Sequence, residues 1–171
     1  MDLIMTYNAS GQLDKNKDAN GSEKGAGVEA AVLLESLDRV DDPRTLLHAV
    51  SESLREGGLI FVTALVCSGF DIAVLGLRNL YIYPPDRANC FSLKGIELLL
   101  MRAGFALLEV STPGVLDVEI IQAHLRHDPA IPLSTFERQL VDADEETRAA
   151  FQSFLQERRL SSFARIVGRK K

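Results

Sequence analysis

The run from Gly25 to Ala30 (GAGVEA) is a glycine-rich stretch whose spacing could cradle a phosphate. It matches the pattern GxGxxA, in which the backbone approaches a dinucleotide closely at a helix N-terminus. That chemistry requires a strand before the pattern and a helix after it. Here a polar stretch precedes the pattern and a strand-like apolar run follows it. A nucleotide loop is therefore the less favoured interpretation of this stretch.

Metal and thiol chemistry have weak support. His124 and His127 have the spacing of two ligands on one helix face, but no Cys or third His stands nearby, and Arg126 would repel a cation. Cys67 and Cys90 lack the paired spacing of a zinc site or a disulfide framework. We expect no metal site, two histidines at a helix end where the dipole favours them, and two buried thiols.

Aromatic and charged residues follow the apolar run Leu59–Val66. Tyr81 and Tyr83 lead into two prolines, which force an extended connection, and Asp86 and Arg87 come next. In open α/β sheets, loops at the carboxyl ends of strands carry the ligand site. The segment is therefore a candidate lid over such a site, with a rigid surface loop as the equally favoured alternative.

A strand, a helix and a second strand must position these residues. Val28–Leu34 and Leu59–Val66 are apolar runs typical of strands covered on both faces. Between them, Asp42 can cap a helix, Pro43 suits its first turn, and Gly57-Gly58 supplies a left-handed helix end. This order predicts a right-handed crossover and a parallel strand pair.

In the rest of the chain, predicted helices and strands also follow one another. Ser92 and the capping box that begins at Ser134 indicate two helix starts. The expected elements are a helix at 93–103, a strand at 105–110, a helix at 115–126, a helix from 135 to about 159 and a final strand at 161–168.

Length and charge limit the class of protein. The chain has 171 residues, enough for one domain with its own core, and a net charge of −5, which argues against a nucleic-acid partner. No apolar run is long enough to span a bilayer and no signal peptide is recognisable, so we expect a soluble, cytoplasmic protein without a membrane partner. Residues 1–26 are expected to be a flexible N-terminal segment and residues 27–171 a single α/β domain.

Several stretches together resemble a known family. They are ESLDRVDDP at 35–43, LREGG at 54–58, LIFVTALV at 59–66, the segment 81–92, RAGF at 102–105 and SSFARIVGRKK at 161–171. In this order and spacing they resemble the C-terminal half of class I S-adenosylmethionine (SAM)-dependent methyltransferases. The similarity is to the small-molecule group that includes ubiquinone-biosynthesis-type enzymes.

The resemblance implies an incomplete Rossmann-like α/β sheet. It would hold the fourth to seventh strands of the family fold with flanking helices, and the last strand would insert antiparallel beside the fifth. The family's first three strands, its glycine-rich SAM loop and its ribose-binding acidic residue would have no counterpart here. An open sheet edge would then remain where the family's first strand pairs, and such an edge favours dimerisation.

The resemblance also implies the residues of a site, although it identifies no catalytic residue. The positions that line SAM in the family are matched here by Glu35, Ser36 and Leu37. The positions that cover the substrate are matched by Arg39, Tyr81, Tyr83 and Arg87. Two of these, Arg39 and Arg87, stand where the family has histidines. Arginine stays protonated in proteins and cannot serve as a base, so positioning of the acceptor would dominate the chemistry.

Three functions are left open. The first is a SAM-dependent, small-molecule methyltransferase family protein that lacks the glycine-rich loop and is inactive alone. The second is a non-catalytic module that pairs through an open sheet edge, as a homodimer or with a complementary subunit. The third is a different α/β enzyme that uses Gly25 to Ala30 as a nucleotide loop. The methyl acceptor and its reacting atom are not determined by the sequence.

Overall fold

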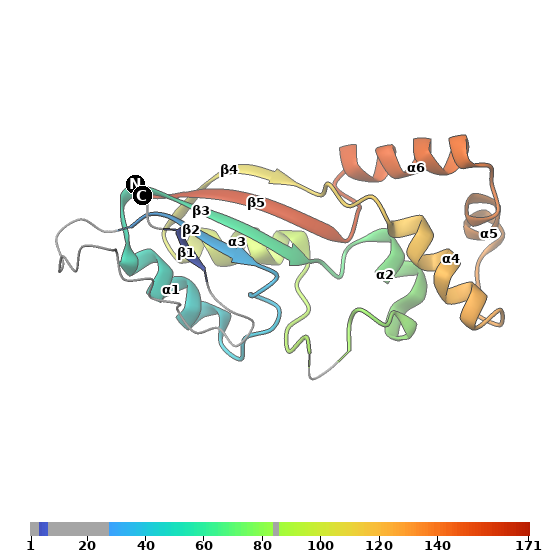
Figure 1. Cartoon of the computed structure of the whole chain (residues 1–171), viewed down its shortest axis with the longest axis horizontal. Helices are drawn as coiled ribbons and strands as arrows, with labels where there is room; N and C mark the ends of the chain where they lie inside the picture. Colours follow the sequence, from blue (N-terminus) through green and yellow to red (C-terminus); the bar gives the residue numbers. More distant parts are fainter. Residues whose placement is uncertain (1–3, 7–27, 84–85) are drawn as a thin grey trace.

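The computed structural model describes residues 4–6, 28–83 and 86–171, which form a five-stranded sheet with helices on one face and beyond one end (Figure 1). The strands lie in the order β1-β2-β3-β5-β4. The elements are β1 (Ile4–Thr6), β2 (Val28–Leu34), α1 (Pro43–Ser53), β3 (Leu54–Leu65), α2 (Phe70–Leu75), the 3₁₀ turn η1 (Gly76–Arg78), α3 (Leu93–Arg102), β4 (Phe105–Ser111), α4 (Asp117–His127), α5 (Thr135–Val141), α6 (Glu145–Glu157) and β5 (Phe163–Lys170).

The unit β2–α1–β3 confirms the predicted parallel pair joined by a helix. The Asp42 carboxylate accepts hydrogen bonds from the backbone N–H groups of Arg44 (3.0 Å) and Thr45 (3.2 Å), and Pro43 opens the helix. Because the strands are parallel, the carboxyl ends of β2 and β3 meet at the same edge of the sheet.

The predicted end of this helix is wrong. Helix α1 ends at Ser53, and Leu54 already belongs to β3, where it lies opposite Val28 and is 2% exposed. The register then shifts, so that Ala30 lies opposite Leu59. Gly57, with φ of 73°, falls within the extra residues of this irregularity. Its left-handed conformation therefore serves a bulge in a strand and not a helix end.

Strand β1 is an element that the sequence analysis did not predict. Ile4–Thr6 pairs in parallel with Ala30–Val32, so the expectation of an open edge on β2 is wrong over these three residues. A three-residue strand is too short to show a periodic pattern, and β2 supplies its pairing. The remainder of the expected flexible segment, residues 7–26, lies outside the described residues.

The glycine pattern GAGVEA lies partly outside the described residues, because Gly25 to Gly27 are not among them. Its last three residues, Val28 to Ala30, belong to strand β2. The pattern is therefore followed by a strand, as expected, and the helix that a dinucleotide loop requires is not there.

Strand β5 confirms the expectation of an antiparallel last strand. It inserts between β3 and β4 and is antiparallel to both, with Phe61 opposite Val167 and Phe105 opposite Lys170. Helix α3, capped by Ser92 as predicted, connects β3 to β4 through the preceding loop. The part of the sheet that holds β2, β3, β5 and β4 therefore has the arrangement that the resemblance implied.

A layer of short helices lies beyond one end of the sheet (Figure 1). The single helix expected from residue 135 to about 159 is two helices, α5 and α6, because Asp144 caps a new helix by accepting from Thr147 N at 2.8 Å. The buried Asp117 of α4 joins this layer to the sheet. Its carboxylate accepts hydrogen bonds from Gln152 (2.7 Å), Ser161 Oγ (2.6 Å) and Ser162 N (2.9 Å).

The two faces of the sheet are covered unequally. Residues that point towards α1 and α3 are almost fully buried: Ala31, Leu33, Ile60, Val62, Ala64, Ala164 and Ile166 are 0–1% exposed. On the opposite face, Leu34 is 62% exposed and Phe61 is 38% exposed. The main apolar core therefore lies between the sheet and helices α1 and α3.

Among residues 4–6, 28–83 and 86–171, no helix combines the length and the apolar character needed to cross a membrane.

Candidate functional site

Two segments meet at the carboxyl ends of β2 and β3. We call residues 35–40, directly after β2, the β2 turn, and residues 79–83 and 86–91 the covering segment. The β2 turn begins with Glu35, whose φ of 47° is left-handed and uncommon for a residue with a side chain. The Glu35 N–H donates to the carbonyl oxygen of Thr63 on β3 at 2.9 Å. Backbone strain of this kind concentrates at functional positions.

The next two residues of the β2 turn point into the protein. Ser36 is 1% exposed, and its Oγ donates to the carbonyl oxygen of Leu34 at 3.1 Å. Leu37 is fully buried in the main core. Of the three residues expected to line SAM, only Glu35 therefore offers its side chain to the surface, and the other two could contribute backbone groups.

Arg87 of the covering segment binds two carboxylates of the β2 turn. Its Nη1 pairs with the Asp38 carboxylate, its Nη2 lies 2.8 Å from Glu35 Oε2, and its Nε donates to the Tyr81 carbonyl oxygen at 2.8 Å. The Arg87 side chain is only 9% exposed. All three of its nitrogen atoms are thus engaged, so Arg87 holds the two segments together and is not free to bind an anionic substrate.

A second arginine makes the reciprocal connection. Arg39 of the β2 turn pairs with Asp86 of the covering segment, and its Nη2 lies 3.7 Å from Glu35 Oε2. Each segment therefore contributes an arginine and a carboxylate to the other, and Glu35 lies between the two arginines. Hydrogen bonds between charged groups are about twice as strong as neutral ones, so the arrangement fixes the geometry of this edge.

The sequence analysis did not single out two residues of this arrangement. Asp38 is 1% exposed, and its Oδ1 has no hydrogen-bond partner among the described residues. Asn89 donates from its backbone N–H to the Asp38 carbonyl oxygen at 2.9 Å and from its side chain to the Val40 carbonyl oxygen. Asp86, which the sequence analysis placed in the candidate lid, pairs with Arg39. One signal was present in the sequence, since both segments place an acidic residue directly before an arginine.

The two tyrosines expected to cover the substrate lie on the surface. Tyr81 is 54% and Tyr83 56% exposed. The Tyr81 ring lies against His124 of α4, with 6.4 Å between ring centroids. Both phenol rings are therefore available to a ligand at the outer side of the covering segment.

His124 anchors the covering segment to α4. Its Nδ1 bonds to the Ile120 carbonyl oxygen at 2.8 Å, and its Nε2 accepts from the Leu80 N–H at 3.1 Å. Both ring nitrogens are thus engaged, and His127 is exposed at the helix end. Within the part of the chain that the structure describes, no group of three or more His, Cys, Asp or Glu side chains is arranged to hold a metal ion.

The two cysteines lie near the same edge, and both are free thiols. The expectation of buried thiols is wrong for Cys90, which is exposed, whereas Cys67 is half-buried. Desolvation, followed by the hydrogen bond with the Cys67 thiol, raises the pKa of Cys90 to about 11. A thiol with such a pKa is a poor nucleophile at neutral pH.

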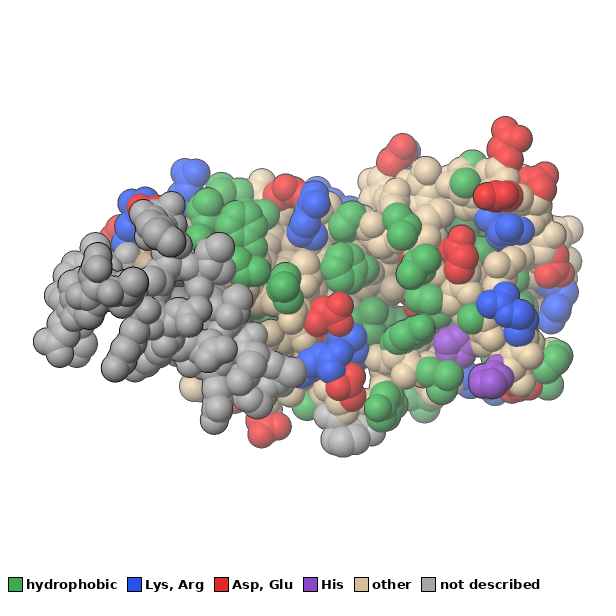
Figure 2. Space-filling model, viewed as in Figure 1, with side chains coloured by type: hydrophobic (Ala, Val, Ile, Leu, Met, Phe, Trp, Pro, Cys, Tyr) green, Lys and Arg blue, Asp and Glu red, His purple; other side chains and the backbone are tan. Residues whose placement is uncertain are grey.

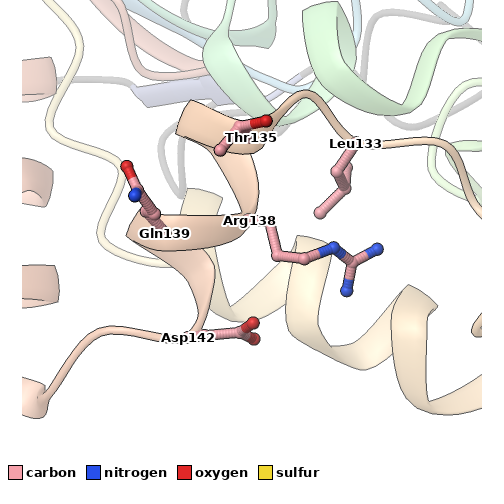
Figure 3. Close-up of a pocket in the computed structure, with 5 residues that line it drawn as sticks. All are labelled: Leu133, Thr135, Arg138, Gln139 and Asp142. Atoms are coloured by element: carbon pink, nitrogen blue, oxygen red, sulfur yellow. The ribbon is translucent and has the colours of Figure 1, made fainter.

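Two cavities lie away from this edge. One has a volume of about 470 Å³ and is lined by residues of α5 and its flanks, namely Leu133, Thr135, Arg138, Gln139 and Asp142 (Figure 3). Another, of about 280 Å³, lies between α4 and the end of α5 at Val141 and Asp142. Neither cavity is lined by residues of the β2 turn or the covering segment.

The chemistry that this edge supports is positioning. Its arginines stay protonated and are paired, so neither can remove a proton from an acceptor. Glu35 offers a carboxylate that is 41% exposed and can accept hydrogen bonds from hydroxyl or amino groups. The edge can therefore hold a ligand in a fixed orientation, and neither arginine supplies acid–base chemistry.

Comparisons with known proteins agree on a family. The model of the methyltransferase domain matches residues 6–110, more than half of the chain. The chain is similar to a solved protein from Thermotoga maritima, with a TM-score of 0.51 and 16% sequence identity. That protein is described as a SAM-dependent methyltransferase and possible histamine N-methyltransferase. The match covers 86% of this chain and 58% of that protein. No curated protein matches the chain.

A second solved structure gives the same result. It is the complex between the Haloferax volcanii Trm112 methyltransferase activator and a methyltransferase, with a TM-score of 0.50, 15% identity, and coverage of 84% of this chain and 54% of that one. The chain therefore spans little more than half the length of the solved proteins that it matches. At these identities the likeness shows the fold, and the family model supplies the relationship. The chain belongs to the methyltransferase-domain family and has part of the sheet of a class I SAM-dependent methyltransferase.

Proposed function

We propose that this chain forms the acceptor-side wall of a SAM-dependent methyltransferase that acts on a small molecule. The observation that carries the proposal is the pairing of the β2 turn with the covering segment at the carboxyl ends of two parallel strands. Ligands of open α/β sheets bind at that edge. Family membership supplies the reaction class, because SAM is the methyl donor of the class I fold.

Glu35 is the residue that best fits contact with SAM. Its carboxylate is exposed and held by two arginines, so it can accept hydrogen bonds from the hydroxyl or amino groups of the cofactor. The backbone of Ser36 and Leu37 would line the same wall. Tyr81 and Tyr83 would cover the acceptor, and Arg39 and Arg87 would hold these two parts together. When bound, SAM supplies an electrophilic methyl group, and the chain orients the acceptor towards it.

We also propose that the chain alone does not catalyse methyl transfer from SAM. By resemblance, the family holds most of SAM with a glycine-rich loop to which residues 28–171 have no counterpart. Loss of that loop removes much of the binding energy that positions the reacting atoms. Binding and turnover therefore need separate measurements.

Calorimetric titration with SAM and with S-adenosylhomocysteine tests the proposal. We expect saturable binding that weakens about tenfold in Glu35→Gln, the equivalent of about 1.4 kcal/mol. Glu56→Gln is the matched control, because Glu56 is 77% exposed at the opposite end of β3, and its affinity should equal that of the unchanged chain. A folded sample that binds neither ligand at millimolar concentration would refute the proposal, as would equal affinities of the two variants.

A second candidate is a subunit without catalytic activity that pairs through its sheet edge. The observation that favours it is strand β1, which is three residues long and lies at the edge of the sheet in the described residues. An edge strand can pair with a second copy or with a complementary subunit. Analytical ultracentrifugation of the chain over a wide concentration range tests this, and a monomer at every concentration argues against the homodimer.

A further inference from the structure

One face of the sheet carries apolar side chains that no helix of the described residues covers. We call it the open face. Its residues on β2, β3 and β5 are Val32, Leu34, Leu59, Phe61, Val167, Arg165 and Arg169. Figure 2 shows hydrophobic side chains gathered over the strands in this region. The register places them side by side, since Val32 lies opposite Phe61 and Phe61 lies opposite Val167.

The contrast with the other face is large. Leu33 and Val62, which point towards α1 and α3, are 0% and 1% exposed. Leu34 and Phe61, their neighbours in sequence, are 62% and 38% exposed. Contiguous exposed apolar area marks an interaction site. The sequence of β3 is apolar on both faces in the same way.

The charges on the open face indicate what covers it. Apolar residues occupy β2 and β3, whereas β5 presents Arg165 and Arg169 beside them, opposite Thr63 and Leu59. Both arginines are exposed. Arg165 donates two hydrogen bonds to Glu109 of β4, which lies on the same face opposite Val167, so its charge is balanced there. The open face is therefore an apolar strip whose basic margin is formed by Arg169, which has no ion pair among the described residues.

An amphipathic helix has the dimensions of this strip. A helix is about 10 Å wide, and strands are about 4.8 Å apart, so one helix covers about two strands. If it lies over β2 and β3, one of its flanks lies over β5. Arg169 of β5 then lies beside that flank.

We propose that the open face binds an amphipathic helix with an acidic flank, contributed by a protein partner. The apolar side of the helix packs on Val32, Leu34 and Phe61, and its acidic flank pairs with Arg169. This inference rests on the proposed role as part of a larger methyltransferase and names the kind of partner that completes the fold. It concerns a surface separate from the edge that would contact SAM.

Fluorescence anisotropy with two labelled helical peptides tests the inference on the full chain. Each probe has 18 residues with leucines along one face, and the flank carries glutamates in one probe and lysines in the other. We expect the chain to bind the glutamate peptide at least about tenfold more tightly than the lysine peptide. Arg169→Glu should reduce this preference at least about fivefold, because it reverses the charge of the basic margin.

Matched variants identify the surface. Phe61→Lys and Leu34→Lys should each weaken glutamate-peptide binding at least about tenfold, whereas Phe136→Lys should not. Phe136 is the control because it is 64% exposed on α5, away from the sheet. Circular dichroism verifies that each variant is folded. Two substitutions on the face are used so that failure of one variant to fold leaves the other informative.

Several outcomes overturn the inference. They are equal affinity for the two peptides, binding that is unaffected by both face substitutions, and no binding of either peptide. Self-association that Phe61→Lys abolishes, without peptide binding, would assign the face to a second copy. Calorimetry with SAM on the same samples separates the two proposals, because peptide binding without SAM binding refutes only the catalytic one.

Discussion

Arg87 is the residue on which the candidate site depends most. It makes contacts with Asp38, Glu35 and the Tyr81 carbonyl oxygen, and its side chain is nearly buried. The sequence analysis treated Arg87 as a residue that covers the substrate. The structure gives it a structural role, because its charge is already balanced by two carboxylates. Arginine suits such a position, since its planar guanidinium can bind several acceptors at once.

Replacement of Arg87 by methionine should be strongly destabilising. Asp38 is 1% exposed, and removal of its partner leaves a buried charge unpaired, which costs about 3–5 kcal/mol. Arg55→Met is the control, because Arg55 is 51% exposed and pairs with Glu29 at the surface, where a pair contributes at most about 1 kcal/mol. The measurement is the urea midpoint of unfolding. If both variants lower the free energy of unfolding equally, the buried pair contributes no more to stability than the surface pair.

Asp71 on α2 is a second buried carboxylate, and it gives a pH dependence. Burial, with a further contribution from the charge of Asp117, raises the pKa of Asp71 above its ordinary value of 3.8. Between the unfolded and the folded pKa, the folded state therefore binds more protons than the unfolded state. The contribution of Asp71 to the free energy of unfolding therefore falls as the pH rises through this interval. The full cost of burying its charge is present above the folded pKa.

Asp71→Asn should therefore raise the melting temperature at pH 7, because it removes the buried charge and keeps an oxygen for the hydrogen bond from Asn79 (2.9 Å). The gain should shrink as the pH is lowered below the folded pKa of Asp71, because the carboxyl of the unchanged chain then becomes protonated. Thermal unfolding at several pH values measures this, with the exposed Asp142→Asn as control. A gain that does not vary with pH would contradict the assigned cause.

At the scale of elements, local signals in the sequence predicted local features. The caps at Asp42, Ser92 and Ser134 could be identified because a cap involves residues only two or three positions apart. The helix end at Gly57 could not, because a left-handed glycine serves a helix end and a strand bulge equally well. Only pairing with β2, a non-local contact, decides between them.

The candidate site was predicted in its place but not in its contacts. The order of strand, helix and strand located the carboxyl edge, and the resemblance pointed to Glu35 and Arg87. The pairing of Arg87 with Asp38, 49 positions away in the chain, depends on how the covering segment folds back over the β2 turn. The close approach of Gly69 to the chain before β5 is another contact between distant residues that no local pattern indicates.

Gly69→Ala should be destabilising because of this approach. A Cβ atom at Gly69 would lie 2.2 Å from the Cα of Ser162, and backbone on both sides leaves little room to move. Overpacking of this kind costs about 1–3 kcal/mol or more. Gly95→Ala is the control, because Gly95 is on helix α3 and its nearest neighbour would be the Ser92 hydroxyl at 3.3 Å. The melting temperature should fall in the first variant and change little in the second.

At the scale of the whole molecule, the asymmetry of the sheet is the main feature. One face is sealed by α1 and α3, and the helical layer beyond the end of the sheet has its own small apolar cluster around Leu75, Ile121, Ile131 and Val141. The resemblance anticipated a partial fold, and the comparisons agree that the chain spans little more than half of the solved relatives. Residue patterns did not show which face would be uncovered, because both faces of β3 are apolar.

The position of β5 has a consequence for synthesis on the ribosome. This strand is the last of the described elements along the chain, yet it lies between β3 and β4 and is the neighbour of both. Translation proceeds at about 5–20 residues per second, so the roughly 100 residues between the end of β3 and the end of β5 take on the order of 5–20 s. During that interval the nascent β3 has no partner on the side that β5 later occupies. The sheet can close only after β5 has emerged, which makes a chaperone during translation valuable to it.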